Sequence, residues 1–195
     1  MENNIFFKYN SNVEPSGGCI LVSEPHLPDN NFDRTVILLC KHDEEGSFGF
    51  VLNRKSNVNL NELMKEAEGI EVPVYIGGPV EQNTLHFVHK DEALTDAELV
   101  NDSFYWGGDF DLLLSWLHDK IIDTDKVRFF LGYSGWGKGQ LMEEIKENSW
   151  IVIEPKSSEL IFADSGSNEM WKDILADMGG RYTMYSKYPE DPRLN

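Results

Sequence analysis

Seven short apolar runs, rich in β-branched and aromatic residues and bounded by Gly, Pro, Asn or Asp, set the main constraint on this fold. Runs of this length and composition predict β-strands, most of them buried on both faces. They lie at residues 18–23, 35–41, 48–52, 73–77, 85–89, 127–133 and 149–154. A chain with this many strand-like runs must build its core around a sheet.

Helical patterns are fewer and follow the strands irregularly. Apolar residues recur at helical spacing in 60–68, 109–119, 139–147 and 168–178, and a short helical turn is predicted at 157–162. Asn59 and Asp109 stand where N-caps are expected. Because helices do not follow every strand, the pattern predicts an α+β fold with a mixed sheet, not a doubly wound nucleotide-binding fold. With no internal repeat or long linker, we expect one domain over 1–195, with frayed ends at 1–16 and 182–195.

The chain is strongly acidic, with 34 Asp and Glu against 17 Lys and Arg, a formal net charge of −17. Residues 61–125 hold 15 acidic and 3 basic residues, and so contribute −12 of that charge. Proteins that bind nucleic acids or anionic membranes rely on Lys and Arg to displace counterions from phosphates. The charge therefore argues against direct nucleic-acid or membrane binding and favours a basic protein partner or divalent ions.

Two cysteines, Cys19 and Cys40, are too few for a disulfide framework, which makes a reducing cytosol the default environment. The first ten residues lack a basic segment followed by an apolar run, and no apolar stretch approaches the roughly 20 residues that span a bilayer. We therefore expect a cytoplasmic protein without a membrane segment.

The glycine-rich segment 132–139 nearly matches two catalytic patterns and completes neither. A phosphate-binding P-loop needs a hydroxyl residue where this chain has Gly139, so a Mg²⁺ ligand is missing. A nucleophile elbow around Ser134 needs glycine where this chain has Trp136. We interpret the segment as a tight turn, and predict neither a catalytic residue nor a cofactor.

The spacing of the cysteine and histidine residues does not fit a zinc site. Cys40 and His42 form a C-x-H pair, and His86 and His89 lie three apart, but no second pair completes a zinc site. On a strand, His86 and His89 also point to opposite faces. The sequence therefore predicts no structural metal.

A polar loop at residues 26–34 precedes the predicted strand at 35–41. The polar pair Asn53-Arg54 follows the predicted strand at 48–52. One interpretation is a loop held by Asx turns, with Phe32 in the core and Arg34 paired to a carboxylate. The other is that Arg34 and Arg54 converge on an anionic ligand, with His26 transferring a proton. The candidate ligand- or partner-binding residues are His26, Asp29, Arg34, Asn53, Arg54, Trp136 and Gln140.

Several strings together carry a family resemblance over residues 18–175. They are ILVSEPHLPDNNFDRTVILLCKH from Ile20, GSFGFVLNR from Gly46, PVYIGGPV from Pro73, LGYSGWGKGQLMEEI from Leu131 and NSWIV from Asn148. In this order and spacing they resemble the YqgE/AlgH family, a largely uncharacterised bacterial group. The resemblance implies a mixed β-sheet partly closed into a barrel and surrounded by helices. It implies no established catalytic residue, and members often carry the label of transcriptional regulators.

Charge, incomplete catalytic patterns and resemblance together favour a cytoplasmic, non-enzymatic protein that regulates transcription through protein contacts without binding DNA. The alternative is an enzyme or small-anion-binding protein with a site near Arg34, Arg54 and the Gly132–Gln140 turn. That alternative requires these segments to converge around a concavity.

Overall fold

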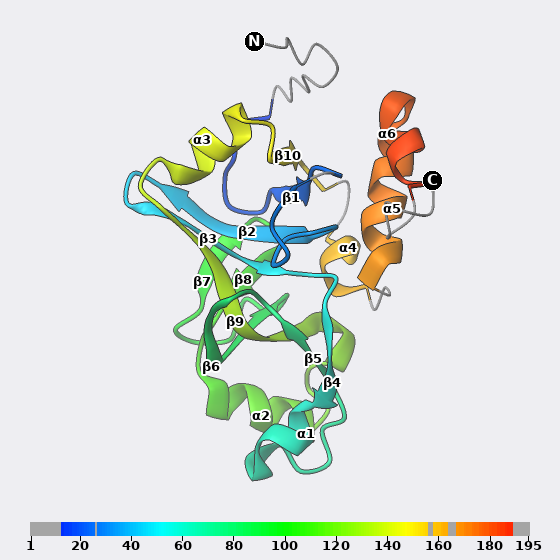
Figure 1. Cartoon of the computed structure of the whole chain (residues 1–195). Coiled ribbons are helices and arrows are strands. Elements are labelled where there is room, and N and C mark those ends of the chain that lie inside the picture. The colour runs from blue at the N-terminus through cyan, green and yellow to red at the C-terminus, as the bar shows by residue number, and fades with distance from the viewer. Residues whose placement is uncertain (1–12, 26, 156–157, 164–166, 189–195) are drawn as a thin grey trace, which may run out of the picture.

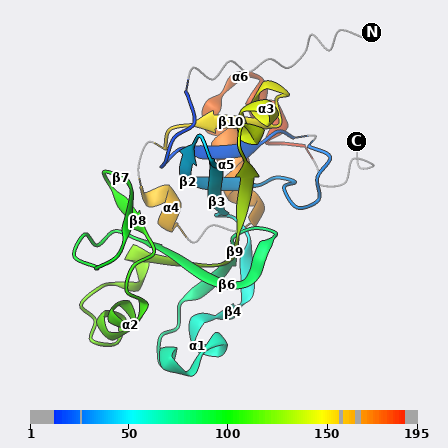
Figure 2. The same ribbon diagram turned by 90° about the vertical axis from the view of Figure 1, so that its left-hand side faces the viewer.

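A computed structural model describes residues 13–25, 27–155, 158–163 and 167–188, and these ranges form one large sheet covered by helices (Figures 1 and 2). The strands are β1 (Ile20–Ser23), β2 (Val36–Asp43), β3 (Gly46–Val51), β4 (Lys55–Asn59), β5 (Pro73–Ile76), β6 (Val80–His89), β7 (Glu98–Asn101), β8 (Phe104–Trp106), β9 (Val127–Gly137) and β10 (Trp150–Ile153). The α-helices are α1 (Leu60–Leu63), α2 (Phe110–His118), α3 (Gln140–Lys146), α4 (Glu159–Phe162), α5 (Ser167–Met178) and α6 (Gly180–Tyr185). Short 3₁₀ turns occupy Lys65–Ala67 and Thr124–Lys126.

Strand β9 belongs to both halves of the sheet. Its first part runs antiparallel to β6 and parallel to β5, while its last part, Ser134 to Gly137, pairs antiparallel with β3. Between them lies Gly132 at φ +66°, where an added Cβ would lie 2.6 Å from the Val80 carbonyl oxygen. A residue with a side chain could not occupy this bend without displacing the backbone of β6. We call β10, β1, β2, β3 and the end of β9 the first half-sheet, and β4 to β8 with the start of β9 the second half-sheet.

The α+β prediction is confirmed, and the expected barrel is wrong. Along the described strands the order runs from β10 through β1, β2, β3, β9, β6 and β8 to β7, with β4 and β5 branching from β9. A barrel requires its two edge strands to pair. Here β10 and β7 lie at opposite edges, and the sheet bends at Gly132 instead of curling around a common axis. The parallel β5–β9 pair makes the sheet mixed, as predicted.

Three hydrophobic clusters hold the helices to the sheet. Helices α4, α5 and α6 cover one face of the first half-sheet (Figure 1). The fully buried Trp171 and Phe50 belong to the hydrophobic cluster on this face. Helix α3 covers the opposite face, where Leu141 and Trp150 are buried. Helices α1 and α2 close the far end of the second half-sheet. Burying such large side chains contributes about 1.5–3 kcal/mol each, so the helices are fixed mainly by apolar packing.

The predicted helix starts are confirmed by their caps. The Asp109 carboxylate accepts a hydrogen bond from the Leu112 backbone N–H at 3.0 Å, and Asn59 forms a capping box with Glu62. The predicted helix over 60–68 breaks into α1 and a 3₁₀ turn. Strands β4, β7 and β8 were not predicted. Strands β4 and β7 are short and contain polar residues, and β8 has only three residues, although all three are aromatic.

The two ends of the chain that were expected to be frayed, 1–16 and 182–195, lie partly within the described residues. Residues 180–185 include the start of the tail expected to fray, and they form α6 with buried Tyr182 and Tyr185. Most of the expected frayed ends, 1–12 and 189–195, lies outside the described residues. Within the described ranges no helix has the length and apolar character needed to cross a bilayer.

Candidate functional site

Asn53 is buried and completes the backbone pairing where β2 and β3 separate. Its Oδ1 accepts from the Val36 N–H at 2.9 Å, and its Nδ2 donates to the Arg34 carbonyl at 2.8 Å. These two bonds use the amide as a substitute for a backbone unit, so Asn53 holds the start of β2 in place.

Arg34 connects the start of β2 to the C-terminal helices. The side chain is buried, its Nη2 donates to the Tyr188 carbonyl at 3.0 Å, and its guanidinium carbon lies 5.3 Å from the centre of the Trp171 ring. The residue sits at φ +48°, a left-handed conformation that a non-glycine residue adopts only when its surroundings enforce it. Through these contacts Arg34 holds the start of β2 against the C-terminal helices.

Arg54 closes the polar loop from the other side. Its Nη2 lies 3.5 Å from the Asn30 carbonyl oxygen, 3.4 Å from that of Asp33 and 3.3 Å from Thr35 Oγ1. Burial lowers the pKa of Arg54, while Asp33 and Asp29 act in the opposite direction. Arg34 and Arg54 thus contact different parts of the chain.

The polar loop contains the predicted Asx turn. Asp29 Oδ1 accepts from the Asn31 N–H at 2.8 Å, and the Phe32 ring packs against the indole rings of Trp136 and Trp150. His26, the proposed proton-transfer group, lies outside the described residues.

Trp136 and Gln140 meet at a carboxylate that the sequence did not single out. The Nε1 atoms of Trp136 and Trp150 both donate to Glu144 Oε2, at 2.8 and 2.7 Å. Gln140 Nε2 donates to Glu144 Oε1 at 2.8 Å, and Gln140 Oε1 accepts from the Gly137 N–H. The i,i+4 spacing of Gln140 and Glu144 on one helix was the signal that could have revealed this pair.

Phe32 joins the polar loop to this cluster. Its ring lies 5.4 Å from that of Trp150, edge to face, and 6.4 Å from that of Trp136. The structure therefore brings the loop and Trp136 together through apolar contact.

The glycine-rich segment is strand where a tight turn was predicted. Residues 132–137 continue β9, and the buried Ser134 Oγ donates to the Gly77 carbonyl at 3.1 Å. A serine in this position is held inside the sheet, away from any approaching substrate. The prediction of a turn failed because Gly132 serves a strand bend close to the backbone of β6, and Gly135 leaves room for the Tyr133 ring.

The histidines and cysteines are separated in the fold. Among the described residues no group of three or more His, Cys, Asp or Glu is placed to hold a metal ion. His89 is buried beside the Gly107 carbonyl, and His42 Nδ1 lies 2.6 Å from Ser47 Oγ. Burial raises the pKa of the Cys40 thiol, which keeps this side chain protonated.

A groove of about 600 Å³ opens between the two half-sheets, and Trp136 is the one described candidate residue among those that line it. Six of the lining residues carry aromatic rings: Phe48, Phe50, His86, Trp106, Tyr133 and Trp136. The Phe48 ring centre lies 4.7 Å from that of Trp106 and 6.3 Å from that of Tyr133. The volume falls in the range of small-ligand pockets. The groove could not be found from sequence because it depends on where four strands meet, and β8, which carries Trp106, has only three residues.

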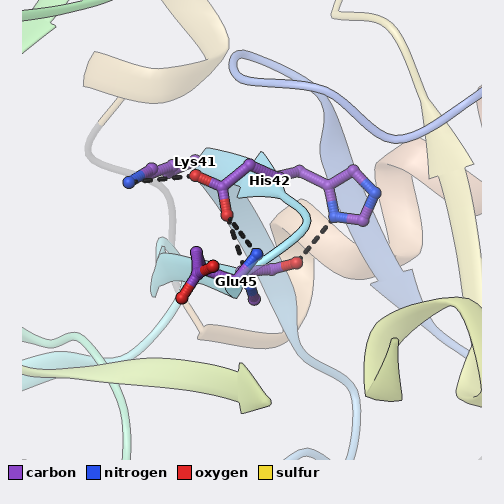
Figure 3. A network of polar contacts seen from close by, with 6 residues as sticks. Lys41, His42 and Glu45 are labelled. Atoms are coloured by element: carbon purple, nitrogen blue, oxygen red, sulfur yellow. Dashed lines mark hydrogen bonds and ion pairs between the residues drawn. The ribbon is translucent and has the colours of Figure 1, made fainter. Parts of the chain in front are cut away.

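Residues of the β2–β3 turn line this groove, among them Lys41, Asp43 and Glu45. Figure 3 shows the polar contacts of this turn. Lys41 Nζ pairs with Asp43 Oδ2 at 3.0 Å, and Asp43 Oδ1 accepts from the N–H groups of Glu45 and Gly46. The hydrogen bond to Asp43 raises the pKa of Lys41, and that to Lys41 lowers the pKa of Asp43. Figure 3 shows Lys41 and Glu45 on one side of the turn and the His42 ring on the other.

Fold and site together define an α+β protein with two half-sheets joined by one bent strand and an aromatic groove between them. The chain belongs to the AlgH-like family, whose model matches residues 20–183. This confirms the resemblance seen in the sequence.

Relatives and solved structures agree with this assignment. An uncharacterised UPF0301 protein of Parabacteroides distasonis is 45% identical over 98% of this chain and 98% of its own length. A second UPF0301 protein, from Cytophaga hutchinsonii, is 43% identical over 91% of this chain and 98% of its own. The solution structure of AlgH from Pseudomonas aeruginosa superposes with a TM-score of 0.70 at 25% identity, covering 93% of this chain and 99% of that one. The crystal structure of protein DIP2367 from Corynebacterium diphtheriae gives a TM-score of 0.74 at 24% identity, covering 90% and 94%.

Proposed function

We propose that this protein is a cytoplasmic, non-enzymatic regulator of transcription that acts by binding a basic protein and does not contact DNA. The observation that carries the proposal is the charge: −17 overall, with −12 in residues 61–125. A field of this sign repels phosphates and accelerates encounters with a cationic partner.

The contacts of the candidate residues support a role outside catalysis. Ser134 is buried in the sheet, Asn53 bridges backbone groups, and Arg54 donates to loop oxygens. Each of these side chains is engaged in holding the fold. The regulator label of the family supplies the remaining part of the proposal.

The first test is duplex DNA binding, measured by fluorescence titration at about 50 mM salt, where phosphate contacts are strongest. We expect no sequence-selective binding. Selective binding that weakens steeply with added salt would refute the proposal.

The second test identifies the partner and its dependence on charge. Cross-linking in a native lysate followed by mass spectrometry names candidates, and each is then purified and titrated against the protein. Neutralising four exposed acids of the acidic segment, Glu66, Glu68, Glu71 and Asp119, should slow association. The control neutralises four exposed acids elsewhere, Glu143, Glu147, Glu169 and Asp173, and should slow it less.

The small-anion alternative makes a separate prediction. If Arg34 and Arg54 bound an anionic metabolite, a thermal-shift screen should show a rise of several degrees for that compound. We expect no such rise, because both guanidinium groups already donate to carbonyl oxygens of the chain.

A further inference from the structure

The groove between the half-sheets presents aromatic faces from four different strands. Phe48 comes from β3, His86 from β6, Trp106 from β8 and Tyr133 from β9. All four are only half-buried, although their rings lie within 4.7–6.5 Å of a neighbour in the set. A cluster of partly exposed rings that lines a cavity marks a binding surface more often than a gap in the core.

The charges at this groove select the sign of its ligand. Lys41 is the one lysine or arginine among the lining residues, and Asp43 pairs with it at 3.0 Å. Burial lowers the pKa of His86, which leaves this ring neutral at pH 7. The exposed Glu45 carboxylate remains, so the lining carries one excess negative charge.

Aromatic faces with a negative rim fit a cation, and a guanidinium better than an ammonium. A guanidinium is planar, weakly hydrated and able to stack on a ring while donating hydrogen bonds from its edge. The chain itself shows the geometry, because the guanidinium carbon of Arg128 lies 3.7 Å from the centre of the Tyr75 ring.

We propose that this groove binds an arginine side chain, with its flanking peptide, from a basic protein partner. The guanidinium stacks against the partly exposed ring surface of Phe48, Trp106 and Tyr133, and its edge donates to Glu45. The volume of about 600 Å³ accommodates one arginine together with adjacent backbone. This inference rests on the proposed function, because it requires a basic protein partner. It specifies where that partner's arginine binds.

The test uses blocked arginine, N-acetyl-arginine-N′-methylamide, titrated into the ¹⁵N-labelled protein and followed by NMR. Blocked citrulline, which has nearly the same shape and no charge, is the matched ligand. We expect arginine to shift the Trp106 indole N–H and the Gly135 amide with millimolar affinity, and citrulline to bind at least fivefold more weakly. Equal shifts from both ligands, or shifts spread over exposed acids outside the groove, would overturn the proposal.

Paired variants locate the site. Trp106→Leu should weaken arginine binding about fivefold, since the cation–π contact between the guanidinium and the partly exposed indole ring is lost. Tyr105→Leu is its control, because Tyr105 is the neighbouring residue on β8 and stacks on His89 instead. Glu45→Gln should weaken binding about twofold to threefold, and Glu44→Gln, one residue away and outside the lining, should leave it unchanged.

The two glutamate variants keep the test decisive if Trp106→Leu does not fold, since both sites are exposed. Glu44→Gln weakening binding as much as Glu45→Gln would overturn the assignment to this groove. Such a failure is distinct from failure of the proposed function, which the DNA titration decides on its own.

Discussion

The guanidinium of Arg128 stacks on the Tyr75 ring, with 3.7 Å between the guanidinium carbon and the ring centre. Arg128 is 3% exposed, and its Nη1 donates to the carbonyls of Ile161 and Ala163 while its Nη2 donates to that of Leu52. One side chain of β9 therefore ties β5, α4 and the end of β3 together. Arg128 could not be selected from the sequence, because an arginine within the run VRFFLGY gives no sign of its partners.

Arg128→Lys should destabilise the fold by about 3 kcal/mol. An ammonium cannot stack on Tyr75 and reach three carbonyls at once, so buried acceptors lose their donors. Urea unfolding monitored by circular dichroism measures the change. Lys146→Arg, an exchange on the exposed face of α3, is the control and should change stability by less than about 0.5 kcal/mol. An Arg128→Lys protein as stable as the wild type would contradict this account.

Asn53→Ala should lower the free energy of unfolding by about 2–4 kcal/mol. The change removes the acceptor of the Val36 N–H and the donor to the Arg34 carbonyl, both in a buried region where water cannot replace them. Denaturant unfolding of Asn53→Ala is compared with Asn57→Ala, whose side chain is exposed on β4. Equal losses in the two variants would show that the Asn53 bridge has no special value.

Glu144→Gln should destabilise by about 1–2 kcal/mol and change the tryptophan emission. The carboxylate accepts from two indole N–H groups and the Gln140 amide, and a neutral amide accepts these hydrogen bonds more weakly. Glu143→Gln changes the adjacent, exposed position on α3 and serves as the control. Emission spectra that do not differ between the two variants would argue against shared hydrogen bonding at Glu144.

His89 should make the protein less stable at acidic pH. Burial lowers the pKa of His89, although Gly107 and Asp91 oppose the shift, and Nδ1 accepts from the Asp91 N–H at 3.3 Å. Because the folded pKa lies below the unfolded value of about 6.5, the unfolded chain binds more protons as pH falls. The stabilisation is complete above about pH 7 and decreases as the pH is lowered through the folded pKa.

His89→Gln should therefore flatten the pH dependence of stability between pH 7 and 5, while its amide can still donate to the Gly107 carbonyl. Urea unfolding at several pH values measures the difference from the wild type, and His118→Gln at an exposed position is the control. Burial also lowers the pKa of His86, which is present in both proteins, so only the difference belongs to His89. A constant difference across this range would refute the prediction.

Local signals in the sequence predicted the larger elements well and the site poorly. The α+β class follows from the order of strand and helix patterns along the chain. The Asp109 cap and the apolar stripe of α5 follow from residue type and spacing within one segment. The aromatic groove depends on where four strands meet, and β8 has only three residues. The turn predicted at Gly132 is a strand bend, because glycine in a bent strand and glycine in a turn cannot be distinguished from sequence without the pairing partners. Asn53 and Arg34 were selected for ligand chemistry, and their actual partners are backbone groups distant in sequence.

The shared strand β9 has a consequence for how the molecule opens. Its residues carry ladder hydrogen bonds to β3 in one half-sheet and to β5 and β6 in the other. Because one continuous strand carries both ladders, loss of one half-sheet would leave part of β9 without its partners, so unfolding should be cooperative across both. The amide protons of Phe129 and Leu131 should accordingly be among the slowest to exchange with deuterated solvent.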